Sequence, residues 1–248
     1  MTDYRVRPRK WQDRDADGIG VLWVSLSKDD TKGDKLRSAA GWMDAHFPRG
    51  WYIDLADTLD RHNRTALYGT PPDQAELEAR KAGQDWIAGQ KPNLDSARHL
   101  KGIITFDHWR THRDFEPTLE QLRNLLDISQ PYEAAVRRDA SEFVTRRFSG
   151  SMSEERRRDL LVSGTNYVLE ETAAGILAAR ELHATRFYPG PQLSSLQLLR
   201  AGNVPHAPAG YDAERYVEFN LERRGPSPQQ NNIPIIGARL KPDDSKLG

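Results

Sequence analysis

The chain has 248 residues, and its 36 Lys and Arg residues balance its 36 Asp and Glu residues, so the net charge at pH 7 is zero. Overall charge therefore indicates no partner, and a nucleic-acid contact would need a local basic patch. The sequence contains no cysteine, which excludes disulfides, thiolate catalysis and zinc–thiolate sites.

The length suits one α/β domain with a sizeable core. The N-terminal stretch MTDYRVRPRKWQDRDADG lacks the apolar region of a signal peptide, and no stretch approaches the roughly 20 apolar residues of a membrane span. We expect a soluble, cytoplasmic protein. Residues 1–17 are predicted to be a flexible N-terminal segment, and residues 18–248 a single domain ending in a Pro- and Gly-rich tail.

The expected elements alternate between strands and helices along the chain. The first half contains strands over 19–26, 51–57 and 103–106, with helices over 34–47 (N-cap Asp34) and 70–89. The second half contains helices over 117–127, 131–148 and 153–182 (N-cap Ser153), then a strand within 186–193 and an optional edge strand within 232–240. This alternation predicts a doubly wound, Rossmann-like parallel sheet.

Two serines lie at the end of the first predicted strand, in the stretch VLWVSLSKDD over 21–30. Ligands of such sheets bind beyond the carboxyl ends of the strands, which is where Ser25 and Ser27 lie. The polar residues either end the strand or supply a nucleophile. No phosphate-binding glycine motif follows a strand, which disfavours a nucleotide cofactor, and the absence of GxSxG disfavours an α/β-hydrolase.

A second informative stretch is NYVLEETAAG over 166–175. Tyr167 and Glu171 are four residues apart, so on a helix they share one face and can point at one ligand. The alternative is that Tyr167 belongs to the core while Glu171 is solvated.

These motifs, in this order, resemble the tRNA-dependent cyclodipeptide synthases. In that family a strand ends at a nucleophilic serine, a tryptophan-bearing helix lies a fixed distance downstream, and a Tyr-x-x-x-Glu helix precedes a strand that carries a tyrosine. Ser25 matches the serine, Trp42 lies seventeen residues later, NYVLEE matches the late helix, and Tyr188 within RFYPG matches the last strand. The resemblance covers roughly residues 18–200.

The resemblance implies a fold like the catalytic domain of class I aminoacyl-tRNA synthetases, without ATP, cofactor or metal. Ser25 would form an ester with the aminoacyl group of the first aminoacyl-tRNA. Tyr167 and Glu171 would hold the substrate ammonium, with Glu171 also able to take a proton from an attacking amine. Tyr188 would orient a carbonyl or the serine. Ser27 is the rival nucleophile, and the spacing to Trp42 favours Ser25.

The sequence departs from the family at two positions. Trp23 stands where a glycine is usual, which suggests a reshaped amino-acid pocket, and Lys28 stands where one branch has asparagine. Lys28 agrees with the branch marked by Tyr188–Pro189, and Tyr132 matches a further tyrosine of the family's pocket.

The strand over 51–57 carries Asp54 between apolar neighbours. This residue either faces solvent or pairs with a cationic substrate side chain, because a buried carboxylate without a partner costs several kcal/mol. The planar fork of arginine suits a carboxylate best, and Trp23 could stack on it. We therefore expect a substrate-binding set of Trp23, Lys28, Asp54 and Tyr132, and a product of the type cyclo(Arg-Xaa) like those of the divergent fungal synthases.

The aminoacyl-tRNA partner needs basic residues. Arg80 and Lys81 lie on the helix after the second strand, and Arg146–Arg147 matches a polar pair near the family's active site. We expect a monomer or weak dimer. Two alternatives stay open: a non-catalytic RNA or small-molecule binding module, and a serine hydrolase, which would need a histidine within reach of Ser25.

Overall fold

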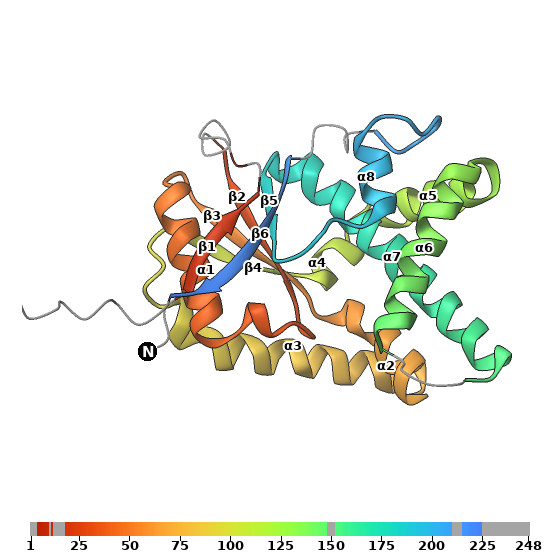
Figure 1. Cartoon of the computed structure of the whole chain (residues 1–248), viewed down its shortest axis with the longest axis horizontal. Helices are drawn as coiled ribbons and strands as arrows, with labels where there is room; N and C mark the ends of the chain where they lie inside the picture. Colours follow the sequence, from red (N-terminus) through yellow and green to blue (C-terminus); the bar gives the residue numbers. More distant parts are fainter. Residues whose placement is uncertain (1–3, 10, 12–17, 148–151, 210–214, 225–248) are drawn as a thin grey trace, which may run out of the picture.

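A computed structural model describes residues 4–9, 11, 18–147, 152–209 and 215–224. Within these residues six strands form one sheet in the order β1-β6-β5-β2-β3-β4 (Figure 1). The strands are β1 (Tyr4–Pro8), β2 (Gly20–Ser25), β3 (Trp51–Ala56), β4 (Leu100–Thr105), β5 (Thr185–Tyr188) and β6 (Arg215–Arg223).

The chain starts its parallel sheet in the middle and builds outward in both directions. From β2 it passes through β3 to β4 on one side, and then returns to place β5 and β6 on the other side of β2, all parallel. The strand order therefore reverses between β2 and β5, which confirms the predicted doubly wound, Rossmann-like class. Among the described strands only β1 pairs antiparallel, with β6.

The described helices largely match those expected. They are α1 (Gly33–His46), α2 (Arg61–Tyr68), α3 (Pro72–Leu94), α4 (Phe106–Arg110), α5 (Phe115–Ile128), α6 (Gln130–Arg147), α7 (Glu154–Leu182) and α8 (Ser194–Arg200). The Ser153 side chain caps α7 by accepting from the amide of Arg156 at 3.2 Å, as expected. Asp34 is not the N-cap of α1, because this helix begins two residues earlier and Lys32 occupies the cap position.

Helices cover both faces of the sheet (Figure 1). Alternating side chains of the central strands, such as Leu22, Val24 and Ile53, pack in one core with residues of α1 and α3. The other set, represented by Trp23, packs in a second core with α5, α6, α7 and α8. This two-sided burial explains why β2 reads as a nearly continuous apolar run.

Several elements were not predicted from the sequence. Part of the N-terminal segment expected to be flexible forms the edge strand β1, and Trp11 packs on Trp42 at 5.1 Å between ring centroids. The helices α2 and α8 and the strand β6 were also missed, because each is short or rich in charge. The optional strand over 232–240 lies outside the described residues.

Two glycines of α3 allow a matched test of how closely this helix packs on the sheet. A Cβ at Gly83 would lie 2.5 Å from Cβ of Asp57, whereas a Cβ at Gly89 meets nothing within 4 Å. We expect Gly83→Ala to lower the free energy of unfolding by about 1–3 kcal/mol through overpacking. Gly89→Ala should raise it by roughly 0.5–1 kcal/mol through helix propensity. Denaturant titration measures both, and equal effects of the two substitutions would contradict this packing.

Candidate active site

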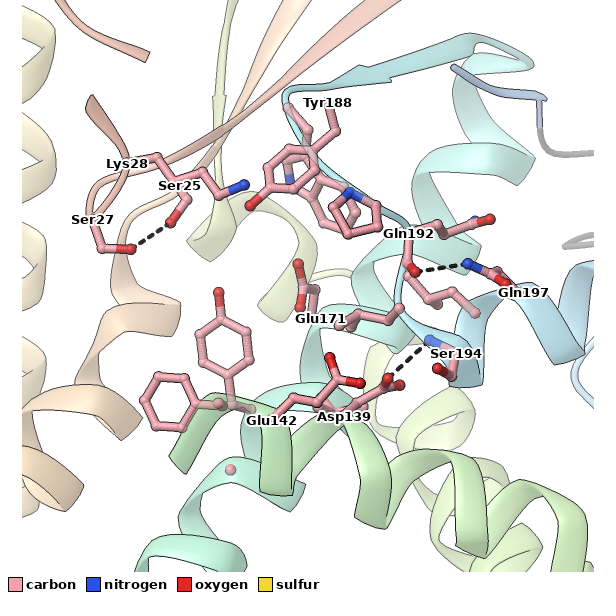
Figure 2. A pocket seen from close by; sticks show the side chains of 18 of the residues that line it. Ser25, Ser27, Lys28, Asp139, Glu142, Glu171, Tyr188, Gln192, Ser194 and Gln197 are labelled. Atoms are coloured by element: carbon pink, nitrogen blue, oxygen red, sulfur yellow. Dashed lines mark hydrogen bonds between the residues drawn. The ribbon is translucent and has the colours of Figure 1, made fainter. Parts of the chain in front are cut away.

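A cavity of about 540 Å³ opens at the carboxyl ends of β2 and β5, where the strand order reverses. Its walls come from the loop after β2, from α6 and α7, and from the segment between β5 and α8 (Figure 2). In an open α/β sheet this reversal leaves a crevice, because the helices that follow the two strands leave toward opposite faces.

Ser25 ends β2 and lines this cavity as a half-buried residue. Its Oγ lies 3.1 Å from Oγ of Ser27, which also lines the cavity and is exposed. The backbone after Ser25 is held in a turn, because its carbonyl accepts from the Lys28 amide at 3.2 Å and from Oγ1 of Thr31 at 3.0 Å. The turn aims the hydroxyl at the cavity.

Tyr167 and Glu171 lie one turn apart on α7, and both line the same cavity as Ser25. Tyr167 stacks on Phe143 of α6 with 6.4 Å between ring centroids. Figure 2 shows the Glu171 carboxylate and the Ser25 hydroxyl on opposite sides of one space. The shared helical face therefore points toward the serine, and Tyr167 also packs against the core behind the cavity.

The environment of Glu171 favours its neutral form. Burial raises the pKa of its carboxyl to about 7, with the negative charges of Asp139 and Asp54 adding to the effect and the cations Arg186 and Lys28 opposing it. A carboxyl with such a pKa can accept or release a proton near neutral pH, which is the requirement for general acid–base work.

Tyr188 and Lys28 form one unit at the rim of the cavity. Nζ of Lys28 donates to the Pro189 carbonyl at 2.7 Å and lies 4.3 Å from the centroid of the Tyr188 ring. Lys28 thus contacts both residues of the Tyr–Pro pair with which the sequence associated it.

A cation of the protein itself, Arg186, acts on Asp54, and this pairing was not predicted from the sequence. Asp54 is 3% exposed, accepts from Nε1 of Trp109 at 3.1 Å, and is stabilised as an anion by Arg186. The guanidinium of Arg186 lies 3.9 Å from the centroid of Trp23, so it occupies the stacking position that we expected for a substrate arginine. Trp23 lines the cavity, whereas Asp54 does not.

Tyr132 is also placed differently from the expectation. It is fully buried in the core between α6 and α7 and does not line the cavity, and burial raises the pKa of its hydroxyl. A direct contact of Tyr132 with substrate would need this core to open.

Arg80 and Lys81, two of the basic residues predicted to bind tRNA, do not line the cavity. Arg80 pairs with Asp107 and Glu76, and Lys81 pairs with Asp85 at 2.6 Å. Arg146 and Arg147 end α6, and their side chains lie outside the described part of the structure.

Other cavity residues were not found from the sequence. The most constrained is Asp139, which is 3% exposed and accepts from the amides of Ser194 and Ser195, both at 2.9 Å, and from Oγ of Ser195 at 2.7 Å. It thereby fixes the start of α8 against α6. Glu142, Gln192 and Tyr216 complete the polar wall. These residues carry no motif, because their neighbours in space come from distant parts of the sequence.

The site also bears on the hydrolase alternative. No histidine occurs among the described residues that line the cavity, so Ser25 has no imidazole base there.

The described residues hold no cluster of three metal-ligating side chains, and none of the described helices is long and apolar enough to cross a membrane.

Comparison with known proteins finds likeness in structure rather than in sequence. No family model and no curated protein matches the chain. A cyclodipeptide synthase from Fluoribacter dumoffii superposes with a TM-score of 0.80 at 15% identity, covering 90% of this chain and 100% of the other. The synthase from Candidatus Glomeribacter gigasporarum, solved bound to Phe-tRNAPhe, gives 0.65 at 16% identity and covers 90% and 93%.

A third structure places this fold among known enzymes. It is a Mycobacterium tuberculosis protein, described as showing that cyclodipeptide synthetases are related to type I tRNA synthetases, with a TM-score of 0.62 at 14% identity over 88% and 93% of the two chains. At these identities the likeness establishes the fold, which is the one that the sequence resemblance implied.

Glu171→Gln tests the environment of the carboxyl through stability. Because the pKa of Glu171 is raised from 4.5 to about 7, the folded protein loses stability as pH rises through this range, by on the order of 2–3 kcal/mol. Glutamine does not ionise, so the variant should be more stable than the wild type at pH 8 and equally stable near pH 4. Denaturant titration at both pH values measures the difference, with the exposed Glu120→Gln as control. A gain of the same size at pH 4 would contradict this assignment.

Proposed function

We propose that the protein is an ATP-independent aminoacyltransferase that makes a cyclic dipeptide from two aminoacyl-tRNAs. The observation that carries this proposal is the placement of Ser25 across one cavity from Tyr167 and Glu171. The cavity thus combines a hydroxyl nucleophile with a carboxyl and a phenol suited to a primary amine, and no imidazole base lines it among the described residues.

In the first step Oγ of Ser25 attacks the ester carbonyl of one aminoacyl-tRNA. A new ester bond to Oγ forms, the bond to the ribose oxygen breaks, and the serine proton passes to that oxygen. One ester replaces another, so the step needs no nucleotide hydrolysis. An aminoacyl ester is already activated, which explains how a serine without a histidine base can react.

In the second step the amine of another aminoacyl-tRNA attacks the Ser25 ester. An amide forms and the serine hydroxyl is regenerated. The amine of the first residue then attacks the remaining tRNA ester, which closes the six-membered ring and releases the tRNA. Each attacking amine must lose a proton, and Glu171 has a pKa of about 7 with which to accept it.

Tyr167 and Tyr188 have complementary roles in this proposal. Tyr167 stands one turn from Glu171 and would share the ammonium with it. Tyr188, at the end of β5, would orient the substrate carbonyl while the cation of Lys28 holds its ring. The contacts of Lys28 with Tyr188 and Pro189 support an assignment to the Tyr–Pro branch.

The choice of arginine as first amino acid stays a prediction. Trp23 already stacks on Arg186, and the charge of Arg186 already stabilises the Asp54 carboxylate, so both residues support a substrate cation less directly than the sequence indicated. Aminoacyl-tRNA as partner is supported by the fold shared with a synthase solved with Phe-tRNAPhe. Arg80, Lys81, Arg146 and Arg147 stay candidates for tRNA contact, and the monomeric or weakly dimeric state stays a prediction.

The covalent intermediate gives the first test. Wild-type protein mixed with total bacterial aminoacyl-tRNA should gain the mass of an aminoacyl group, measured on intact protein after acid quenching. Ser25→Ala should lose this adduct completely, whereas Ser27→Ala should keep it.

The pair of serine variants also distinguishes the alternatives. An adduct that persists in Ser25→Ala and vanishes in Ser27→Ala would identify Ser27 as the nucleophile. A wild-type protein that retains charged tRNA on a filter but never gains mass would instead favour the non-catalytic binding module.

The product gives the second test. Expression in a bacterial host should add an ion to the medium whose mass matches a cyclic dipeptide, absent from cells expressing Ser25→Ala. Growth on isotopically labelled arginine should shift this mass if arginine is incorporated. An unshifted ion would reject the arginine preference while leaving the activity, and the absence of any new ion would oppose the proposed function.

A further inference from the structure

The reaction steps proposed above give no role to Arg186, a buried arginine beside the cavity. It lies on β5 two residues before Tyr188 and is 3% exposed. Its side chain leaves the sheet on the same face as Trp23, whose ring centroid lies 3.9 Å from the guanidinium. A permanent cation is thus enclosed directly behind a wall of the cavity, because Trp23 itself lines that wall.

The helix α7 is shaped to accept this cation. Nη2 of Arg186 donates to the carbonyl of Gly175 at 3.2 Å, and a Cβ at this position would lie 3.0 Å from Nη1. A glycine here lets the helix approach the guanidinium. Gly175 is one turn after Glu171, so the contact brings the arginine beside the segment that carries the carboxyl.

Two carboxyls, that of the buried Asp54 and that of the half-buried Glu171, interact with the charge of Arg186. Arg186 lowers the pKa of Asp54 and of Glu171, whereas the negative charge of Asp54 raises the pKa of Glu171. Asp54 is held in place by the indole of Trp109 at 3.1 Å. One positive charge cannot neutralise both carboxylates, so the cluster favours a state that keeps one proton.

We propose that Arg186 and Asp54 are positioning residues that set the pH range in which Glu171 holds a proton. They thereby match the acidity of the Glu171 carboxyl to that of the α-amino group of the substrate. The inference rests on the proposed function for the identity of the amine. Neither residue needs to touch substrate: each acts through Glu171. An α-amino group titrates in the range of about 7.7–8.0, so a carboxyl held near neutrality can exchange a proton with it.

The other groups around Glu171 are fixed by separate contacts. Lys28, after β2, favours the carboxylate and donates to Pro189, and Asp139 on α6 opposes the carboxylate and caps α8. Glu142 on α6, Tyr167 on α7, Tyr188 on β5 and Tyr216 on β6 share the cavity with it. Substitution at positions 54 and 186 therefore changes the charge near Glu171 and leaves these contacts in place.

Two substitutions of opposite sign test the proposal. Asp54→Asn keeps the volume and an oxygen that accepts from Trp109, and it removes a negative charge, so Glu171 should titrate about 0.5–1 pH unit lower. Arg186→Gln removes a positive charge, so Glu171 should titrate higher by roughly the same amount. Arg186→Lys keeps the charge and should restore a value close to that of the wild type.

The measurement is a ¹³C NMR titration of protein labelled at the glutamate carboxyl carbon, with Glu171 assigned by the loss of its signal in Glu171→Gln. The acid limb of the pH profile for aminoacyl-enzyme formation should move with the NMR value in each variant. If Arg186→Gln does not fold, Asp54→Asn and Arg186→Lys still decide the outcome.

The proposal would be overturned if the Glu171 midpoint in Asp54→Asn stayed within about 0.2 pH unit of the wild-type value. It would also be overturned if the midpoint moved in the same direction in Asp54→Asn and Arg186→Gln. Arg186 would then be a structural residue. NMR shifts of the expected signs without any aminoacyl-enzyme in the wild type would leave the charge cluster standing and reject the proposed function instead.

Discussion

The cavity exists because the strand order reverses between β2 and β5. At this point one connection leaves toward α1 on one face of the sheet, while the long helix α7 enters β5 from the other face. No helix can cover the carboxyl ends of both strands, so Ser25 and Tyr188 end at a shared opening. Everything proposed about chemistry depends on this separation.

A second constraint is the buried charge below that opening. Burying Arg186 and Asp54 beside the half-buried Glu171 costs free energy, and such clusters seldom raise stability over an apolar core of the same shape. The protein offsets part of this cost by stacking Arg186 on Trp23 and by hydrogen bonds from Trp109 and to Gly175. The benefit is a carboxyl whose proton is exchangeable near neutral pH. This is the trade of stability for reactivity that active sites commonly show.

The structure gives a physical reason for Trp23 and Lys28, the two residues that depart from the family pattern in the sequence. A glycine in place of Trp23 would leave the guanidinium of Arg186 without its aromatic partner. Lys28 supplies the contact to Pro189 and Tyr188. Trp23, Arg186 and Asp54 come from three neighbouring strands of the sheet and face the same side, so they form one unit in which a cation, an aromatic ring and a carboxylate are mutually dependent.

The sequence alone determined the fold class and the helix that carries Tyr167 and Glu171, because hydrophobic periodicity and the four-residue helical repeat are local properties. It also placed Ser25 at the end of a buried strand. Short or charged elements such as β1 and α8 were beyond it, since their stability comes from pairing with β6 and from the cap of Asp139. Only the tertiary structure decided that the partner of Asp54 is Arg186 of the same chain, 132 positions away, and that Tyr132 is core. Which charges meet in a buried site is set by strand order and helix packing, and no local pattern encodes that distance in space.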